Sequence, residues 1–502
     1  MDTRTGRPTR RERALVPVLV FLTAVVAVIS SLGAPMIPTI AAVDHVSLSE
    51  AQWSLTVTML VGAVATPVLG RLGDGPSRRT ATLTAAAVVV LGSVLAALPL
   101  GFGWLITGRA LQGVGVGLTS LTIATARDSL PAERSRSAVA LLSITTVAGV
   151  GLGYPITGLI AQSFGFHAGF WFGAAISAVA LVLAALVLPS TEGRERRPLD
   201  APGAVLLGLA LVGLLMVLSE GESWGWASTR LWTVSALSLL LLAGWIRHEL
   251  RTAHPLVDLR SLANPVVLTA DVAGLVAGVG MYLLMSLVIR YVQTPVSTGY
   301  GLGASVVVAG LALLPFSVFS LLTSKVVPVL ARRTSPAAVL PVGCAVSLGS
   351  VLFFLFARGS LWELLVVMAI AGLGVGCTFA VMPGLIVGAV PAGEVGSAVG
   401  FNQLLRTVGY STGSALCGAV LQAHTAPGRA LPADSGYRDA ALIGCAVWVV
   451  IGLATIVLPR LTAAAAARRG VRVDEELMVE ESIADGVAGE SDVPVLRAGA
   501  ER

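Results

Sequence analysis

The chain has 502 residues, of which 55% are hydrophobic and 12% are charged, and its mean hydropathy is +0.86. A soluble globular chain carries roughly 25% charged residues, so this composition excludes water as the main solvent of the fold. The sole lysine, Lys325, follows Ser324 and precedes Val326, which excludes a Walker A nucleotide site, and the formal charge of +5 is scattered over short loops and does not indicate nucleic acid.

Uncharged apolar runs recur from Ala14 to Pro459, and each is close to the roughly 20 residues that a helix needs to cross a bilayer. The first run continues into further runs, so we interpret it as an uncleaved helix and not as a signal peptide. We therefore predict an all-α polytopic membrane protein. Its fourteen transmembrane helices are predicted near residues 14–36, 52–72, 81–100, 104–126, 138–161, 167–189, 203–219, 229–247, 266–289, 304–326, 337–357, 362–388, 397–421 and 439–459.

Lysine and arginine lie mainly on one side of the predicted membrane. The basic N-terminal tail, residues 1–13, and the loops after the even-numbered helices hold 20 of the 33 Lys and Arg residues, whereas the opposite side holds five. The positive-inside rule then places both termini in the cytoplasm. We interpret the acidic C-terminal stretch, residues 461–502, as a disordered cytoplasmic tail.

An internal repeat relates the two ends of this series of helices. Residues 70–79 after the second helix and 324–333 after the tenth both end in an arginine pair. Similarly, GVGVGLT at 113–119 in the fourth helix corresponds to GLGVGCT at 372–378 in the twelfth. The repeat predicts two six-helix bundles, with an inserted transmembrane hairpin between them. The predicted segments are the first bundle at 14–189, the hairpin at 203–247 and the second bundle at 266–460.

The loop after the second helix has the sequence GRLGDGPSRR. Glycine permits a tight reversal, and the carboxylate of Asp74 is suited to cap the positive N-terminus of a helix in the other half. We therefore take Gly70, Asp74, Arg78 and Arg79 as a candidate gate or conformational latch. The alternative interpretation is a solvated turn that carries a positive-inside arginine pair.

Three charged residues lie inside predicted helices and at least five residues from either end, where an ionisable group is a functional candidate. They are Arg109, Asp271 and Arg406. An arginine at the bilayer centre costs about 2.5–3.5 kcal/mol unless it meets water or a partner, so we take these three and Gln112 as candidates for proton coupling or for lining a cavity. The alternatives are that Arg109 snorkels to an interface and that Asp271 is an acid at a helix start.

The fifth helix contains GVGLGYPITG at residues 149–158. Small residues let helix backbones approach closely, and a proline frees a carbonyl group and bends the helix. We take Gly149, Gly153, Pro155 and Gly158 as a candidate functional motif of this helix. Plain glycine-mediated packing, without any bearing on the direction of transport, is the alternative.

The motifs at 70–79, 105–115 and 149–158 resemble three successive signatures of the major facilitator superfamily, although Ser77, Tyr154 and Leu159 replace glycines of the usual patterns. With the 6+2+6 layout, the chain resembles the fourteen-helix drug:proton antiporter family. The resemblance implies the major facilitator fold and alternating access, in which an apolar or cationic compound leaves the cell while a proton enters. It also implies that Asp74 latches the cytoplasmic gate, that Arg109 faces a central cavity, and that the fifth-helix motif is typical of antiporters.

We expect a multi-pass protein of a bacterial cell membrane, because arginine almost replaces lysine in the sequence. We expect a functional monomer whose partners are a small-molecule substrate, protons and the lipid bilayer, without nucleic acid. No cofactor, catalytic residue or metal site is expected, because a proton gradient would supply the energy.

Two other classes of function stay open. An importer or facilitator of a small metabolite would share the fold and the first motif. A membrane-embedded sensor or enzyme is more remote, since the sequence holds no His-Glu-x-x-His motif. A transport assay would separate these classes.

Overall fold

The computed structural model describes residues 10–458 except 33–35, 191–197, 334, 336–337, 392, 427–428 and 430, and over these residues the chain is helical and contains no strand. The chain divides into a unit of residues Met1–Thr455 and a second unit, Ile456–Arg502, of which only the end of the last helix is described. The predicted tails at 1–13 and 461–502 lie outside the described residues, apart from 10–13 at the start of the first helix.

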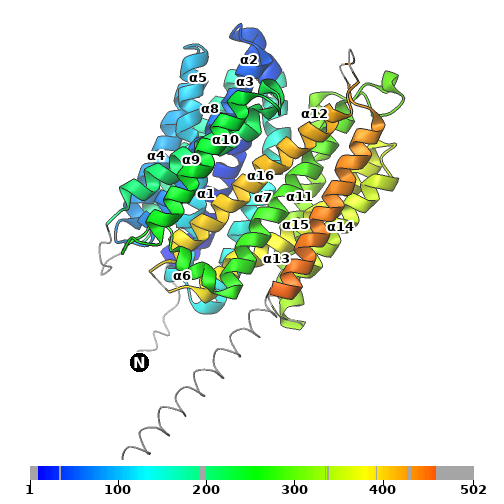
Figure 1. The fold of residues 1–502 in the computed structure, drawn as a ribbon. Helices are drawn as coiled ribbons and strands as arrows, with labels where there is room; N and C mark the ends of the chain where they lie inside the picture. The colour runs from blue at the N-terminus through cyan, green and yellow to red at the C-terminus, as the bar shows by residue number, and fades with distance from the viewer. Residues whose placement is uncertain are drawn as a thin grey trace, which may run out of the picture. The chain divides into compact units, whose positions relative to one another are not determined.

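The described helices follow the predicted order, and Figure 1 shows them running side by side. The first six predicted segments hold α1 (Arg10–Ser31), α2 (Ile37–Val43), α3 (Leu48–Gly73), α4 (Arg78–Ala97), α5 (Phe102–Gly113), the 3-10 turn η2 (Val114–Gly117), α6 (Leu118–Ser129), α7 (Ala132–Phe164) and α8 (Phe166–Val187). The predicted hairpin holds α9 (Ala201–Trp224) and α10 (Thr229–Glu249). The last six segments hold α11 (Pro265–Gln293), α12 (Val306–Ala312), α13 (Leu314–Arg333), α14 (Val339–Phe356), α15 (Leu361–Ala389), α16 (Val395–Ala423) and a final helix, Asp434–Leu458.

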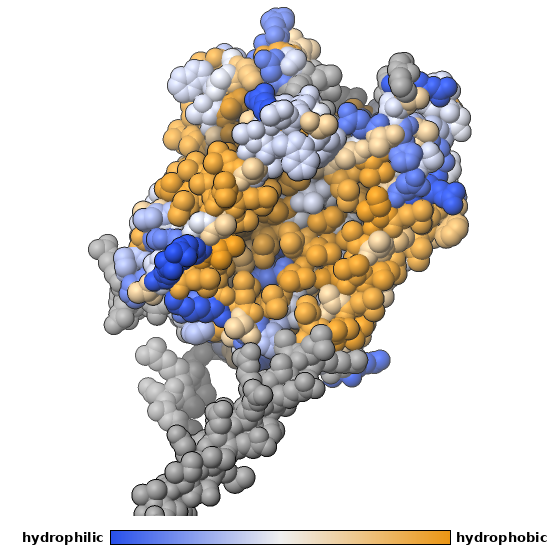
Figure 2. Space-filling model, viewed as in Figure 1, coloured by the Kyte–Doolittle hydropathy of each residue, from blue (hydrophilic) through white to orange (hydrophobic). Residues whose placement is uncertain are grey.

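Eleven of the described helices are long and apolar enough to cross a membrane, and α7, whose two parts meet at 40°, makes a twelfth. On the face shown in Figure 2, hydrophobic residues cover the middle of the helices while hydrophilic residues gather towards their ends. The predicted spans near 104–126 and 397–421 are helical but are not among the twelve. The first is divided into short pieces, and α16 carries polar residues such as Asn402, Gln403 and Arg406. The count of fourteen therefore stays a prediction.

Local sequence explains where several helices begin and break. Ser47 and Glu50 form a capping box at the start of α3, in which each side chain accepts a hydrogen bond from the other residue's backbone N–H. The segment predicted as one helix near 104–126 is instead interrupted by η2, because the glycines of GVGVG favour the helix poorly and let the backbone tighten. The segment predicted near 304–326 is likewise divided, into α12 and α13 at Leu313.

The repeated glycine run makes the same contact in both halves of the chain. A methyl group placed on Gly117 would lie 3.1 Å from the Cα of Thr66 in α3, and one placed on Gly376 would lie 3.0 Å from the Cα of Ser320 in α13. Thr66 and Ser320 occupy corresponding places in the two repeats, as Gly117 and Gly376 do. The sequence repeat thus corresponds to an equivalent approach of two helices in each half.

The two halves meet through few helices. From the first half, α3 packs against α16, and α7 packs against α13 and α15. The inserted hairpin lies against α3 and α16, where Leu207 and Leu211 of α9 and Trp245 of α10 join one apolar cluster with Leu60 of α3 and Phe401 of α16. The hairpin therefore covers the pair of helices through which the halves touch.

The close approach of α4 and α5 predicts that this helix contact tolerates little added bulk. Gly92 of α4 faces α5, and a methyl group there would lie 2.6 Å from the carbonyl oxygen of Gly108. We expect Gly92→Val to destabilise the protein by about 1–3 kcal/mol through overpacking, measured as a lower midpoint of thermal unfolding in detergent. Gly349→Val in α14 is the matched control, because nothing lies within 4 Å of that position. Equal unfolding temperatures for the two variants would contradict the close α4–α5 approach.

Candidate functional site

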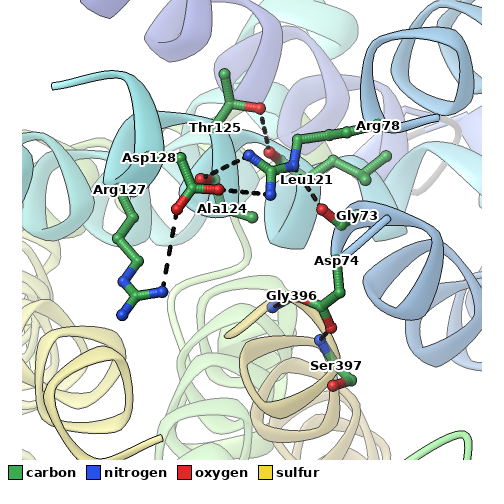
Figure 3. A network of polar contacts seen from close by, with 10 residues as sticks. All are labelled: Gly73, Asp74, Arg78, Leu121, Ala124, Thr125, Arg127, Asp128, Gly396 and Ser397. Atoms are coloured by element: carbon green, nitrogen blue, oxygen red, sulfur yellow. Dashed lines mark hydrogen bonds and ion pairs between the residues drawn. The ribbon is translucent and has the colours of Figure 1, made fainter. Parts of the chain in front are cut away.

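Asp74 joins the two halves at the end of α3. Its Oδ1 accepts a hydrogen bond from the Gly396 N–H at 2.6 Å, and its Oδ2 accepts one from the Ser397 N–H at 2.9 Å (Figure 3). Both donors lie in the first turn of α16, where backbone N–H groups lack helical partners and the helix dipole is positive. The carboxyl group is 7% exposed. This burial raises the pKa of Asp74, while the hydrogen bonds from Ser397 and Gly396 oppose the rise.

Gly70 makes this contact possible. A methyl group on Gly70 would lie 2.5 Å from the carbonyl oxygen of Gly396, and one on Gly396 would meet the carbonyl oxygen of Gly70. The backbones of α3 and α16 therefore touch one turn before Asp74, and only residues without a Cβ fit there. Gly70 and Asp74, predicted as parts of one latch, lie at one contact between the halves.

The two arginines of the same motif bind elsewhere, inside the first half. Arg78 forms an ion pair with Asp128 of α6 at 2.6 Å, and it also donates to the carbonyl oxygens of Gly73 and Ala124 (Figure 3). Arg79 donates to the carbonyl oxygen of Ala185 in α8 at 2.8 Å. Both arginines fix the loop after α3 to other helices of the first half. They therefore hold Asp74 in place where it contacts α16.

Arg109 lies at the centre of a hydrogen-bond network within the first half and is 0% exposed, so it does not snorkel. Its guanidinium donates to the carbonyl oxygens of Ile29 and Ser30 in α1 and of Ser54 in α3. It also donates to Oε1 of Gln112 at 2.6 Å, and Gln112 in turn donates to Ser93 of α4. Arg109 and Gln112 therefore tie together four helices of the first half.

Asp271 lies in α11 and is 3% exposed, so it is buried within the protein. Its Oδ1 accepts a hydrogen bond from Nδ2 of Asn402 in α16 at 2.9 Å, and Asn402 also donates to the carbonyl oxygen of Ala270. Gly274 permits the close approach of α11 and α16, because a methyl group there would lie 2.9 Å from Nδ2 of Asn402 and 3.1 Å from Cγ of Arg406. Asn402 and Arg406 thus flank Gly274, and no ion pair joins Asp271 to Arg406 among the described residues.

Arg406 reaches across the boundary between the halves. Its Nη1 donates to Oγ of Ser143 in α7 at 3.3 Å, and its Nε donates to the hydroxyl oxygen of Tyr410 at 3.3 Å. Its guanidinium lies 3.9 Å from the centre of the Phe379 ring in α15. Ser143 itself donates to the carbonyl oxygen of Phe379 at 2.7 Å. This cluster therefore draws on α7 from the first half and on α15 and α16 from the second.

The glycine motif of α7 serves two helix contacts. Methyl groups on Gly149 and Gly153 would collide with Ala27 and Ser31 of α1, so these two glycines face the first half. The intervening Gly151 faces Ser317 of α13 in the second half. Pro155 removes the N–H that would bond residue 151, which accounts for the bend at that residue. Gly158, the remaining residue of the predicted motif, is buried.

The predicted residues thus form separate groups and not one pocket. Three residues that sequence reasoning missed complete these groups: Asp128, Ser143 and Asn402. Asn402 lies one helical turn before Arg406, so the i, i+4 spacing could have identified it. Asp128 follows Arg127 in a stretch that was interpreted only through its positive charge. Ser143 has no local signal, because its role depends on the contact between the halves.

Comparison with known families matches residues 19–414 to the Major Facilitator Superfamily. An uncharacterised MFS-type transporter of Mycobacterium tuberculosis is 29% identical over 82% of this chain, which spans 60% of that relative's length. The tetracenomycin C resistance and export protein of Streptomyces glaucescens is 28% identical, over 75% of this chain and 70% of its own. The methyl viologen resistance protein SmvA of Salmonella typhimurium is 25% identical, over 84% of this chain and 85% of its own.

Among solved structures, the human organic anion transporter MFSD10 (TETRAN) resembles this chain with a TM-score of 0.62. The match covers 89% of this chain and 100% of that one at 15% sequence identity. Such a likeness supports the predicted major facilitator fold and, at this identity, nothing finer.

Loss of the Asp74 carboxylate is expected to loosen the contact between α3 and α16. Hydrogen bonds to a charged group contribute about 1.5–3 kcal/mol, so Asp74→Asn should expose the start of α16 roughly tenfold more often. A cysteine at position 397, in a chain whose four native cysteines are replaced by serine, would report this through its rate of alkylation. Glu133→Gln, at an exposed acid of α7, is the charge-matched control. Unchanged alkylation in Asp74→Asn would show that the carboxylate does not hold the two helices together.

Proposed function

The chain belongs to the Major Facilitator Superfamily, and from this premise we propose that it is a secondary active transporter that exports drugs or other apolar or cationic small molecules in exchange for protons. The observation that carries the proposal is the burial of Asp271 and Arg406 within helices, together with the contact of Arg406 with Ser143 of the other half. Ionisable groups are costly inside a membrane and mark pathways for substrates or protons.

The names of several relatives support export as the direction. They include a tetracenomycin C resistance and export protein, the multidrug resistance protein Stp and a methyl viologen resistance protein. These names refer to more than one compound, so the relatives support a class of cargo and not one compound. The glycine-proline motif of α7, which packs against both α1 and α13, agrees with an antiporter that keeps a dry seam between its halves.

The Asp74 contact is proposed to act as the cytoplasmic latch of alternating access. A pair of hydrogen bonds from a helix N-terminus is strong when made and can be exchanged for water when broken. Gly70 permits the contact, while Arg78 and Arg79 hold Asp74 on the first bundle. The orientation proposed from the positive-inside rule puts this latch and both termini in the cytoplasm of a bacterial cell.

Asp271 is proposed to carry the coupling proton. The buried acids among the described residues are Asp74, Asp200, Glu249 and Asp271. Asp200 and Glu249 belong to the inserted hairpin, and Asp74 lies at the end of a span, so Asp271 is the buried acid within a helix of the two bundles. Arg109 and Gln112, by contrast, are proposed to hold α1, α3, α4 and α5 as one unit while the halves rock.

Transport in everted membrane vesicles tests the proposal directly. We expect vesicles containing the full chain to accumulate dyes and antibiotics from a panel of compounds when a pH gradient is imposed. Accumulation should stop when a protonophore collapses the pH gradient. The chain is proposed to work as a monomer and without a cofactor, so the gradient should suffice. Equilibration of a compound across the membrane without accumulation, at a rate that ignores the gradient, would favour a facilitator. No movement of any compound would overturn transport altogether.

Neutralising Asp271 is expected to separate proton coupling from substrate movement. Asp271→Asn keeps the shape and an oxygen that can accept from Asn402 but removes the titrating group. We expect accumulation driven by the pH gradient to be lost, while exchange of labelled for unlabelled compound across the membrane continues. Asp44→Asn, in the loop after α2, is a matched control that should keep both activities. Gradient-driven accumulation by Asp271→Asn at the wild-type rate would remove Asp271 as the proton carrier.

A further inference from the structure

Arg406 has unused hydrogen-bonding capacity in a place where such capacity is costly. The side chain is 1% exposed, and its Nη2 is buried without a hydrogen-bond partner. Its two hydrogen bonds, to Ser143 and Tyr410, are both long at 3.3 Å and both go to neutral hydroxyl groups. A buried donor that is left unsatisfied, especially a charged one, carries a desolvation penalty. Residues of the protein therefore satisfy only part of the hydrogen-bonding capacity of this buried cation.

The other buried intramembrane arginine shows what a fully satisfied guanidinium looks like in this protein. Arg109 makes hydrogen bonds to three backbone carbonyl oxygens and one amide oxygen, three of them between 2.6 and 2.9 Å. Arg406 has no comparable set of acceptors. The contrast between the two residues indicates a structural task for Arg109 and leaves Arg406 available to a ligand.

The buried acid Asp271 does not neutralise Arg406. No ion pair within 4.0 Å links its carboxylate to Arg406 in the part of the chain that is described. The Asp271 carboxylate instead accepts a hydrogen bond from Nδ2 of Asn402 at 2.9 Å. A guanidinium forms its strongest contacts with carboxylates and other oxyanions, which it binds through two parallel N–H groups. An oxyanion would therefore satisfy Arg406 better than the two hydroxyl groups that it contacts.

Aromatic rings surround this cation. The guanidinium lies 3.9 Å from the centre of the Phe379 ring, and Phe379 packs edge-on against Tyr410 with ring centres 6.4 Å apart. Tyr410 in turn stacks on Tyr282 of α11, with centres 4.6 Å apart. Tyr154 of α7 and Tyr282 are both partly buried, and both pack against the same apolar cluster of buried residues. These rings offer stacking faces to a planar ligand next to the free guanidinium nitrogen.

We propose that Arg406 and the rings of Phe379, Tyr410, Tyr282 and Tyr154 form a recognition site for planar aromatic substrates that carry an oxyanion, such as a carboxylate or phenolate. The inference rests on the proposed transport function and deepens it, because it adds aromatic acids to the class of cargo. The site contains residues of α7 from the first half and of α11, α15 and α16 from the second. A ligand bound there would be held by both halves.

The charge of the substrate determines whether the membrane potential helps to drive its exchange for a proton. An anion that leaves the cell and a proton that enters both carry positive charge inwards. An inside-negative membrane potential therefore drives the exchange of an aromatic acid, whatever the stoichiometry. Exchange of one monovalent cation for one proton moves no net charge, so the same potential leaves it unchanged.

Two dyes that share the xanthene ring system provide the test: fluorescein, which is anionic, and rhodamine 123, which is cationic. The purified full chain in proteoliposomes is given a pH gradient, and the transported dye is extracted and quantified at one fixed pH. We expect Arg406→Gln to lower fluorescein transport by about tenfold or more relative to rhodamine 123 transport by the same variant, as expected for loss of a charge-assisted hydrogen bond to one ligand only. Arg438→Gln, at an exposed arginine of the final helix, is the charge-matched control and should transport both dyes normally.

Two milder variants keep the test decisive if Arg406→Gln does not fold into a monodisperse protein. Arg406→Lys keeps the charge but not the paired N–H groups, and Tyr410→Phe keeps the ring but not the hydroxyl that Arg406 contacts. Both should lower fluorescein transport selectively. An equal loss for the two dyes in each variant, or wild-type transport of fluorescein by Arg406→Gln, would overturn the proposal.

Equilibrium binding separates this inference from the transport function on which it rests. Fluorescence polarisation of each dye with the purified protein in detergent needs no gradient and no turnover. Weaker fluorescein binding in Arg406→Gln, with rhodamine 123 binding unchanged, supports the site even if no dye is transported. If the wild type moves neither dye, the proposed exchange of these compounds fails. If it moves both dyes but binds fluorescein no better than Arg406→Gln does, the site fails while transport stands.

Discussion

A charge placed inside the membrane-spanning part of this chain has to be solvated by the protein itself. Arg109 meets this requirement with backbone carbonyl oxygens of α1 and α3 and with Gln112, and Asp271 meets it with the amide of Asn402. Arg406 has hydroxyl groups and an aromatic face only. A charge with a full set of hydrogen bonds holds helices together. A charge with fewer hydrogen bonds remains available to bind a ligand or a proton.

The same requirement shapes the contacts between the two halves. Helices approach through glycines within a half, as at Gly117 and Gly376, and also between the halves, as at Gly70 and Gly396. Beside the Gly70–Gly396 contact, the Asp74 carboxylate binds backbone N–H groups at the start of α16. Close packing resists change, whereas hydrogen bonds can be replaced by water.

The sequence predicted the membrane class, the order of the segments and the family, because apolar runs and local motifs are properties of neighbouring residues. It also located Asp74 and the buried charges. It did not predict that GVGVG interrupts a helix, since the cost of glycine depends on packing around it. Nor could it show that Arg78 pairs with Asp128 or that Arg406 reaches Ser143, because these pairs join helices whose approach only the fold determines.

The inserted hairpin adds a constraint on any movement of the halves. Its helix α9 contacts both α3 and α16, and Trp245 of α10 lies against Phe401 of α16 with ring centres 6.3 Å apart. At its base, His248 of α10 contacts the carboxylate of Asp200 at 3.0 Å, which ties α10 to the start of α9. The hairpin is therefore braced as one unit over the helices that Asp74 joins. Separation of α3 from α16 would have to expose or slide this apolar contact, so the inserted helices stabilise the contact between α3 and α16.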